Sequence, residues 1–167
     1  MKEKKLLQNF FIIWIAACLV GVGTGCRTYN SESEKAQALW NRGQVALAAQ
    51  EYQELAEKNR NSKDHVIFYL EHGASARTAD LIDNSQTAFK LAENKIDEYE
   101  DKADVSVTRE SGATFSNQAN LPYRGKSYDK IMLNTYQALN YWQTGEFDKA
   151  RVELFLAYQR QQDAVEE

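Results

Sequence analysis

Two histidines are the side chains with the clearest capacity for metal chemistry in this chain. His65 and His72 lie seven residues apart, with Asp64 and Glu71 beside them. Helical zinc sites typically pair histidines four residues apart and add at least a third ligand. The sequence offers neither feature, so we predict no metal site. We expect His65 to cap a helix and His72 to lie on the surface or pack against its neighbours.

Carboxylates are abundant, for example at Asp97, Glu98, Glu100 and Asp101. A run of charge on a helix usually forms a solvated face, whereas general acid–base catalysis needs a positioned pair of groups. No serine lies in a Gly-x-Ser-x-Gly setting, and no glycine-rich phosphate loop occurs outside the N-terminal apolar segment. The sequence therefore nominates no catalytic residue and no cofactor, and we expect that the protein is not an enzyme.

Both cysteines lie near the N-terminus. Three lysines precede an apolar run from Leu6 to Val22, an order that is typical of a secretory signal. Cys18 lies within this run and Cys26 lies just after it. No disulfide and no cysteine-based metal site is therefore available to the rest of the chain.

The residues around Cys26 suggest what that cysteine does. Small residues, ending in Thr24 and Gly25, come directly before Cys26, and polar residues follow it. This pattern resembles the bacterial lipobox, whose cysteine is acylated with chains such as palmitate and becomes the new N-terminus. The resemblance implies a signal peptide at residues 1–25 and lipidation at Cys26, with Cys18 as the alternative. An uncleaved membrane-spanning helix is a further alternative, since the segment is long enough.

The residue after Cys26 bears on location. In lipoproteins an Asp at that position is the familiar signal for retention at the inner membrane, and this chain has Arg27 there. The resemblance therefore implies a lipid-anchored protein of the bacterial cell envelope. It favours the outer membrane, facing the periplasm, with the inner membrane as the alternative.

The remainder of the chain has the composition of one helical domain, residues 26–167. The chain has 167 residues, of which 43% are hydrophobic and 26% charged, with 8 glycines and 1 proline. So few helix breakers favour an all-α fold. The net charge of −4 makes the chain a poor nucleic-acid binder, because binding to phosphate needs clustered Lys and Arg.

Apolar residues at three- and four-residue spacings predict three helical hairpins, at about 31–58, 65–100 and 128–162. An insert at 101–127 precedes the last hairpin, and within it the alternation over 105–108 predicts a short strand. Inserts of this length in a compact helical array are often functional.

The three hairpins share one pattern, counted from turn positions Gly43, Asp80 and Gly145. A small residue lies seven positions before each turn and another lies five after it, and a large apolar residue lies nine after it. Small residues let paired helices approach closely, and the large residue fills the groove. Hairpins that pack in series bury a continuous core between neighbours. The residues that define the repeats are Ala36, Gly43, Ala48 and Tyr52; Gly73, Ser85, Phe89 and Ala92; and Ala138, Gly145, Ala150, Leu154 and Ala157.

This layout resembles the tetratricopeptide (TPR) repeat family. The resemblance implies about three TPR-like antiparallel hairpins, stacked as a short solenoid. The chain departs from the family pattern in its early aromatic residue, which is kept only as Tyr69, with Glu32 and Asn134 at the corresponding positions. Asp80 also replaces the turn glycine. An ordinary helical bundle is the alternative.

A narrower resemblance rests on the lipobox and on four further features, which are Tyr69–Gly73, Pro122–Gly125, Ala138–Tyr141 with Gly145, and Ala150–Glu153. Together they are similar to a family of uncharacterised bacterial envelope lipoproteins with TPR-like helices. The resemblance covers residues 26–160 and supplies no activity. Members usually continue beyond this point, which implies that the chain is a shortened version.

Aromatic and basic residues gather in the last third of the chain. Because Tyr, Trp and Arg anchor protein interfaces, the candidate binding residues are Tyr123, Arg124, Tyr128 and Arg151. Tyr123 and Arg124 fit binding and structural docking equally well. We expect a membrane-anchored scaffold that binds a protein or peptide in the envelope. The alternatives are an envelope enzyme or enzyme subunit acting on cell-wall material, which needs two convergent carboxylates in a cleft, and a truncated family member whose missing C-terminal part carries the function.

Overall fold

The computed structural model describes residues 29–107 and 121–166. The chain divides into two units, Met1–Ser31 and Glu32–Glu167, and the helices lie in the second except for residues 29–31, which begin the first described helix. Cys18, Cys26 and the predicted signal peptide lie outside the described residues, as do residues 108–120 of the predicted insert.

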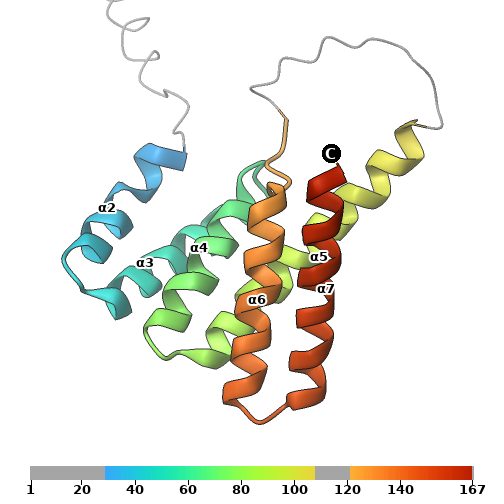
Figure 1. The fold of residues 1–167 in the computed structure, drawn as a ribbon. Coiled ribbons are helices and arrows are strands. Elements are labelled where there is room, and N and C mark those ends of the chain that lie inside the picture. The colour runs from blue at the N-terminus through green and yellow to red at the C-terminus, as the bar shows by residue number, and fades with distance from the viewer. Residues whose placement is uncertain (1–28, 108–120, 167) are drawn as a thin grey trace, which may run out of the picture. The chain divides into compact units, whose positions relative to one another are not determined.

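All regular structure within the described residues is α-helical, so the predicted all-α class is confirmed. The helices follow one another in pairs along the chain (Figure 1). They are α2 (Tyr29–Asn41) and α3 (Val45–Lys58), α4 (His65–Thr78) and α5 (Ile82–Val107), and α6 (Ser127–Gln143) and α7 (Phe147–Glu166).

The turns inside the three pairs have the same backbone geometry. Gly43, Asp80 and Gly145 all adopt left-handed conformations, with φ of 73°, 61° and 80°. In each turn this residue donates its N–H to the carbonyl three residues earlier, and the next residue donates to the carbonyl five residues earlier. These hydrogen bonds satisfy the last carbonyls of the first helix and end it.

Helix α5 is longer than the sequence predicts, because it begins at Ile82 and continues to Val107. The predicted short strand at 105–108 is therefore wrong for residues 105–107, which are helical. An alternation of four residues is too short to distinguish strand from helix. The preceding turn also favours the helix. The Lys102 ammonium forms an ion pair with the carboxylate of Glu98, four residues earlier, with the nitrogen and oxygen 2.6 Å apart.

Neighbouring hairpins pack through their adjoining helices. Helix α3 packs against α4, and α5 packs against α6. Helix α4 also contacts α6. In Figure 1, α5 passes behind α6 and α7. The rings of Phe89 on α5 and Tyr136 on α6 stack with their centroids 5.8 Å apart. The largest fully buried apolar side chains are Val66, Phe68, Phe89, Ile96 and Leu133.

Within the second hairpin, α4 and α5 approach closely at Gly73. A Cβ added there would lie 2.7 Å from the ring of Phe89, which is closer than carbon atoms can pack. The other small residues of the shared pattern, Ala36, Ala48, Ser85, Ala92, Ala138, Ala150 and Ala157, are also buried. The small residues of the pattern are therefore buried in all three pairs.

Candidate interaction surface

Helix α6 exposes large side chains along one side. Tyr128, Met132, Leu139 and Trp142 are all exposed, and their spacing of four, seven and three residues places them on one face of the helix. We call these four residues the α6 stripe. At its end, Trp142 is 65% exposed and meets the ring of Phe147 edge-on, with centroids 5.9 Å apart.

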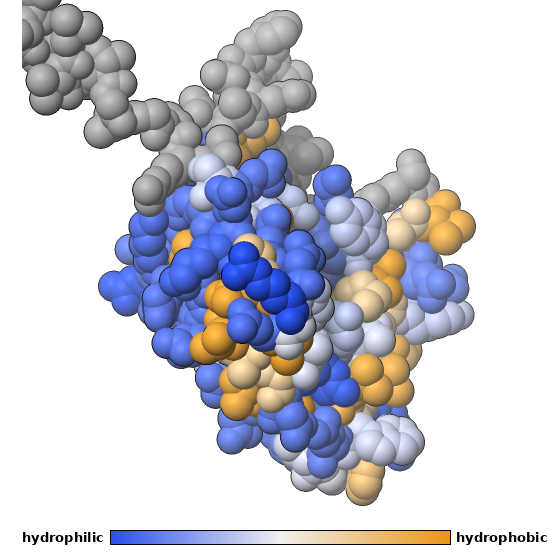
Figure 2. Space-filling view, turned by 90° about the vertical axis from the view of Figure 1, so that its left-hand side faces the viewer, coloured by the Kyte–Doolittle hydropathy of each residue, from blue (hydrophilic) through white to orange (hydrophobic). Residues whose placement is uncertain are grey.

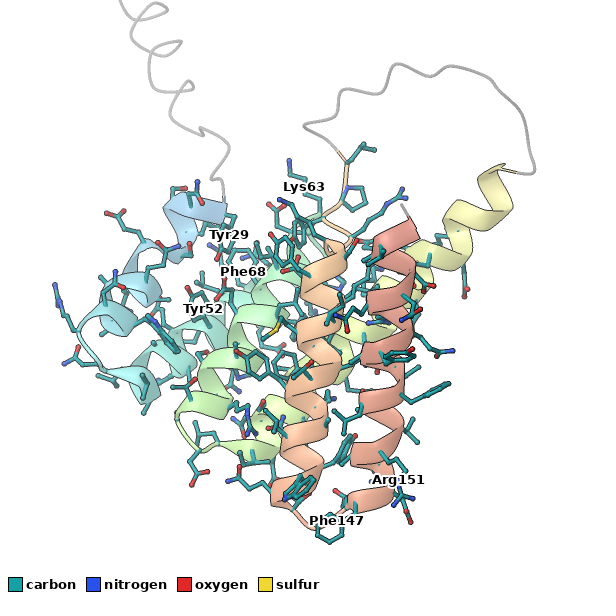
Figure 3. The ribbon with its side chains drawn as sticks, viewed as in Figure 1. Tyr29, Tyr52, Lys63, Phe68, Phe147 and Arg151 are labelled. Atoms are coloured by element: carbon teal, nitrogen blue, oxygen red, sulfur yellow. The ribbon has the colours of Figure 1, made fainter. Side chains whose placement is uncertain are left out.

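Helix α7 exposes a second set of side chains along its outer side. In Figure 3, Phe147 lies at the start of α7, and Arg151 projects from the helix one turn further on. We call the outer residues the α7 face. Its members are Phe147, Arg151, Leu154, Tyr158, Gln161 and Val165, and all are exposed.

Leu154 differs from its counterparts in the other two hairpins. Tyr52 and Phe89 occupy the same position relative to their turns and are 4% and 2% exposed, whereas Leu154 is 51% exposed. Tyr52 lies on α3 and Phe89 on α5, helices that a following hairpin covers. Within the described residues no helix covers α7 in that way, so the predicted role of Leu154 in filling an inter-hairpin groove is not realised there.

Large exposed apolar residues are scarcer on the first hairpin. In α2 and α3 the exposed large apolar side chains are Trp40 and Leu47. Figure 2, which views the molecule from the side of these helices, shows hydrophobic areas separated by a mostly hydrophilic surface. Exposed apolar area is thus concentrated on α6 and α7.

Tyr123 is held by structural contacts. Its backbone N–H donates to the carbonyl of Lys63 at 2.8 Å, and its hydroxyl donates to the carboxylate of Asp129. Burial and this carboxylate raise the pKa of Tyr123 well above its usual value. These contacts dock the segment before α6 onto the loop before α4. The Tyr123 hydroxyl already donates its hydrogen to Asp129, so it does not offer that donor to a binding partner.

The other three candidate binding residues are more accessible. Arg124 is exposed on the segment leading into α6. Tyr128 begins the α6 stripe, with the Lys126 ammonium 5.6 Å from its ring centroid. Arg151 belongs to the α7 face and lies 3.5 Å from Asp148, with its side chain 81% exposed. The structure therefore places Tyr128 and Arg151 on different surfaces.

A polar cluster, buried except for the exposed Lys90, joins α5, α6 and α7. The Asn134 amide donates to Glu153 at 2.7 Å and approaches Glu93 at 3.4 Å. Glu93 also accepts from Lys90 at 2.9 Å. We call these four residues the polar seam. Burial raises the pKa of Glu153, with a further contribution from the charge of Glu93, while the hydrogen bond from Asn134 opposes the shift.

Glu93 and Glu153 are two carboxylates that converge on Asn134, but they lie in a packed interior and not in the cleft that the enzyme alternative requires. Sequence reasoning did not nominate them. Both are buried and are hydrogen-bonded to Lys90 and Asn134. This arrangement therefore fits a role in packing the helices together better than a catalytic role on cell-wall material. A sequence signal was present, since Asn134 replaces the aromatic residue that the repeat pattern places there, at a core-facing position of α6.

The two histidines are buried side chains of α4. His65 is the first residue of α4, and the N-cap position belongs to Asp64, so the prediction that His65 caps the helix is wrong. Burial lowers the pKa of both His65 and His72, which favours their neutral forms. Across the described ranges, no three His, Cys, Asp or Glu residues gather in a metal-binding group.

None of the helices in the described part is both long and apolar enough to cross a membrane. Comparison with protein-family models, with curated proteins and with solved structures finds no match to this chain.

Proposed function

We propose that this protein is a binding scaffold whose α6 stripe engages another protein or an extended peptide. The observation that carries the proposal is the stripe itself, four large side chains exposed along the length of one helix. Single exposed apolar residues are common on soluble proteins, but an aligned set marks an interaction site.

The composition of the stripe suits a protein partner. Tyr and Trp contribute large contact area at low entropic cost, and Met adapts to different partner surfaces. Lys126, beside Tyr128, and the exposed Arg124 add positive charge near the start of α6. A partner segment with apolar residues and an acidic end would match this surface.

The proposed architecture is a short TPR-like solenoid. Three pairs of helices with identical turns, each packed on the next, support it. In such an array the first helices of successive pairs line one side, and α4 meets α6 as this arrangement requires. The α6 stripe would then form the end of that shared binding side.

The proposed location is the bacterial envelope, with lipid on Cys26 holding the scaffold at the outer membrane. Metabolic labelling with a palmitate analogue tests this part. We expect the label on the full chain and on Cys18→Ser but not on Cys26→Ser. Label lost only from Cys18→Ser would move the anchor to the alternative cysteine, and an unlabelled chain would contradict lipid anchoring.

Site-specific photo-crosslinking tests the binding surface. A photoreactive residue replacing Leu139 in the full chain should give a discrete adduct in intact cells, and the same residue replacing exposed Gln53 on α3 should not. Met132→Asp in the Leu139 variant should abolish the adduct, because it places a charge within the stripe. The same adducts from both positions, or none from position 139, would contradict the proposal.

A further inference from the structure

The α7 face has the spacing of a coiled-coil seam. Phe147, Arg151, Leu154, Tyr158, Gln161 and Val165 follow one another at intervals of four, three, four, three and four residues. This alternation is the heptad pattern that keeps one line of side chains facing a partner helix. Since α7 spans 20 residues, the seam runs along nearly its whole length.

The order of residues along this seam has the same character in both directions. From the N-terminal end it is apolar, polar, apolar, apolar, polar, apolar, and the reversed order is identical. If two copies of α7 lie antiparallel, Phe147 faces Val165, Arg151 faces Gln161, and Leu154 faces Tyr158. Each apolar residue then meets an apolar one, and the Arg151 guanidinium meets the Gln161 amide oxygen, an acceptor.

The other hairpins show that this side of a second helix is suited to packing. The equivalent face of α3 includes the buried residues Ala49, Tyr52 and Ala56. The equivalent face of α5 includes Phe89 and Ile96, also buried. In both cases the covering element is a helix, α4 or α6. The α7 face therefore lies where this fold accepts another helix.

We infer that two copies of this chain associate through α7, antiparallel and related by a two-fold axis. A two-fold interface uses the same patch on both copies, so the patch must be complementary to itself. The α7 face meets that requirement because its layers match when it is reversed. This inference concerns α7 and does not depend on the α6 stripe having a partner.

Disulfide trapping in the full chain tests the proposed geometry. In a Cys18→Ser background, Arg151→Cys combined with Gln161→Cys should give a dimer of twice the chain mass on mild oxidation in membranes. Positions 151 and 161 of one helix are about 15 Å apart, too far for a bond within one copy. Arg151→Cys alone should not give the dimer. In an antiparallel pair, position 151 of one copy lies about 15 Å from position 151 of the other, which is too far for a disulfide.

A control pair on the same helix has its two cysteines seven residues apart, compared with ten in the trapping pair. Val152→Cys combined with Gln159→Cys lies on another side of α7 and should not trap a dimer, although both positions are exposed. Adding Leu154→Glu to the trapping pair should reduce the dimer about tenfold or more, because it places a charge in the central layer. Leu154 is exposed, so helix content measured by circular dichroism should be unchanged.

Three results would overturn the inference. The first is the absence of a trapped dimer from the double variant, and the second is equal trapping from Arg151→Cys alone or from the control pair. The third is preferential trapping of a different protein, recognised by an adduct mass other than twice that of the chain. Failure here leaves crosslinking from position 139 untouched, so the two proposals are tested separately.

Discussion

Single residues determine how closely the helices of this protein approach and how its buried charges are balanced. Gly73 permits contact between α4 and α5, and Asn134 links two buried carboxylates across three helices. Gly73 acts by lacking a Cβ atom, and Asn134 acts through its side-chain amide. Substitutions at these contacts should therefore change the stability of the protein measurably.

Gly73→Ala should destabilise the protein by about 1–3 kcal/mol, because the new Cβ would overlap the Phe89 ring and force a shift in a packed interior. Urea unfolding followed by circular dichroism measures the change. Combining it with Phe89→Leu should cost less than the sum of the two single changes, since the smaller side chain makes room. Additive costs would show that the two residues do not compete for the same space.

Glu153→Gln should stabilise the protein at pH 7.5 and have little effect near pH 4. The folded state raises the pKa of Glu153, so the contribution of this group to stability is present below its unfolded pKa and is lost as pH rises through the folded one. Glutamine can still accept the hydrogen bond from Asn134 and carries no charge. Thermal unfolding of both proteins across this pH range measures the difference.

Glu146→Gln provides a control of opposite sign for that experiment. A hydrogen bond from Lys149 lowers the pKa of Glu146, so its contribution is present at neutral pH and is lost as pH falls through the folded pKa. Its replacement should therefore slightly destabilise the protein at pH 7.5, and this cost should shrink as the pH falls to about 4 and below. The same pH trend for both variants would contradict the assignment of Glu153 as a buried, disfavoured charge.

At the scale of elements, the three hairpin turns form a matched set. All three require a left-handed residue, which costs glycine little and other residues more. Gly43 and Gly145 meet this requirement with glycine, whereas Asp80 occupies the same conformation with a side chain. The turns therefore respond differently to the same kind of change.

Gly145→Ala should destabilise the protein by about 1 kcal/mol. No atom lies within 4 Å of the new Cβ, so the cost comes from the backbone conformation alone. Asp80→Gly should relieve the corresponding strain, although it loses the hydrogen bond from Gln143 at 2.7 Å. Because that bond is exposed and weak, we expect no net loss of stability, and a clear destabilisation by Asp80→Gly in urea unfolding would contradict this account.

At the scale of the whole molecule, a chain of polar contacts crosses the hairpins. Ser85 on α5 donates to the carbonyl of Gly73 on α4 at 2.8 Å. It also accepts from Asn140 on α6 at 2.9 Å, and Asn140 in turn accepts from Arg77 on α4 at 2.5 Å. The second and third hairpins are therefore joined by hydrogen bonds as well as by apolar packing.

Ser85→Ala should destabilise the whole array by about 1–3 kcal/mol, because it leaves the buried amide of Asn140 without its acceptor. Thr87→Ala is the control, since Thr87 is exposed and bonds only within α5. It should change stability little. Urea unfolding of the two variants compares them directly, and equal effects would show that the contact between hairpins contributes nothing.

The helical class of this chain could be predicted from its sequence, whereas the character of its surface could not. Apolar spacing and the scarcity of Gly and Pro are local properties, and they suffice to predict helices. The short alternation at 105–108 misled the prediction, because so few residues do not define a period. The polar seam was missed because Glu93, Asn134 and Glu153 are far apart in sequence, and only their packing brings them together.

The amino-acid sequence by itself determined that this chain folds into α-helices, because helix formation depends on residues within a few positions of one another. Only the tertiary structure decided that Phe89 is buried while Leu154, at the equivalent position, is exposed. It also decided that Tyr123 is tied to Lys63 and Asp129. The physical reason is that the exposure of a side chain depends on what lies across from it in space, which spacing along one helix does not specify.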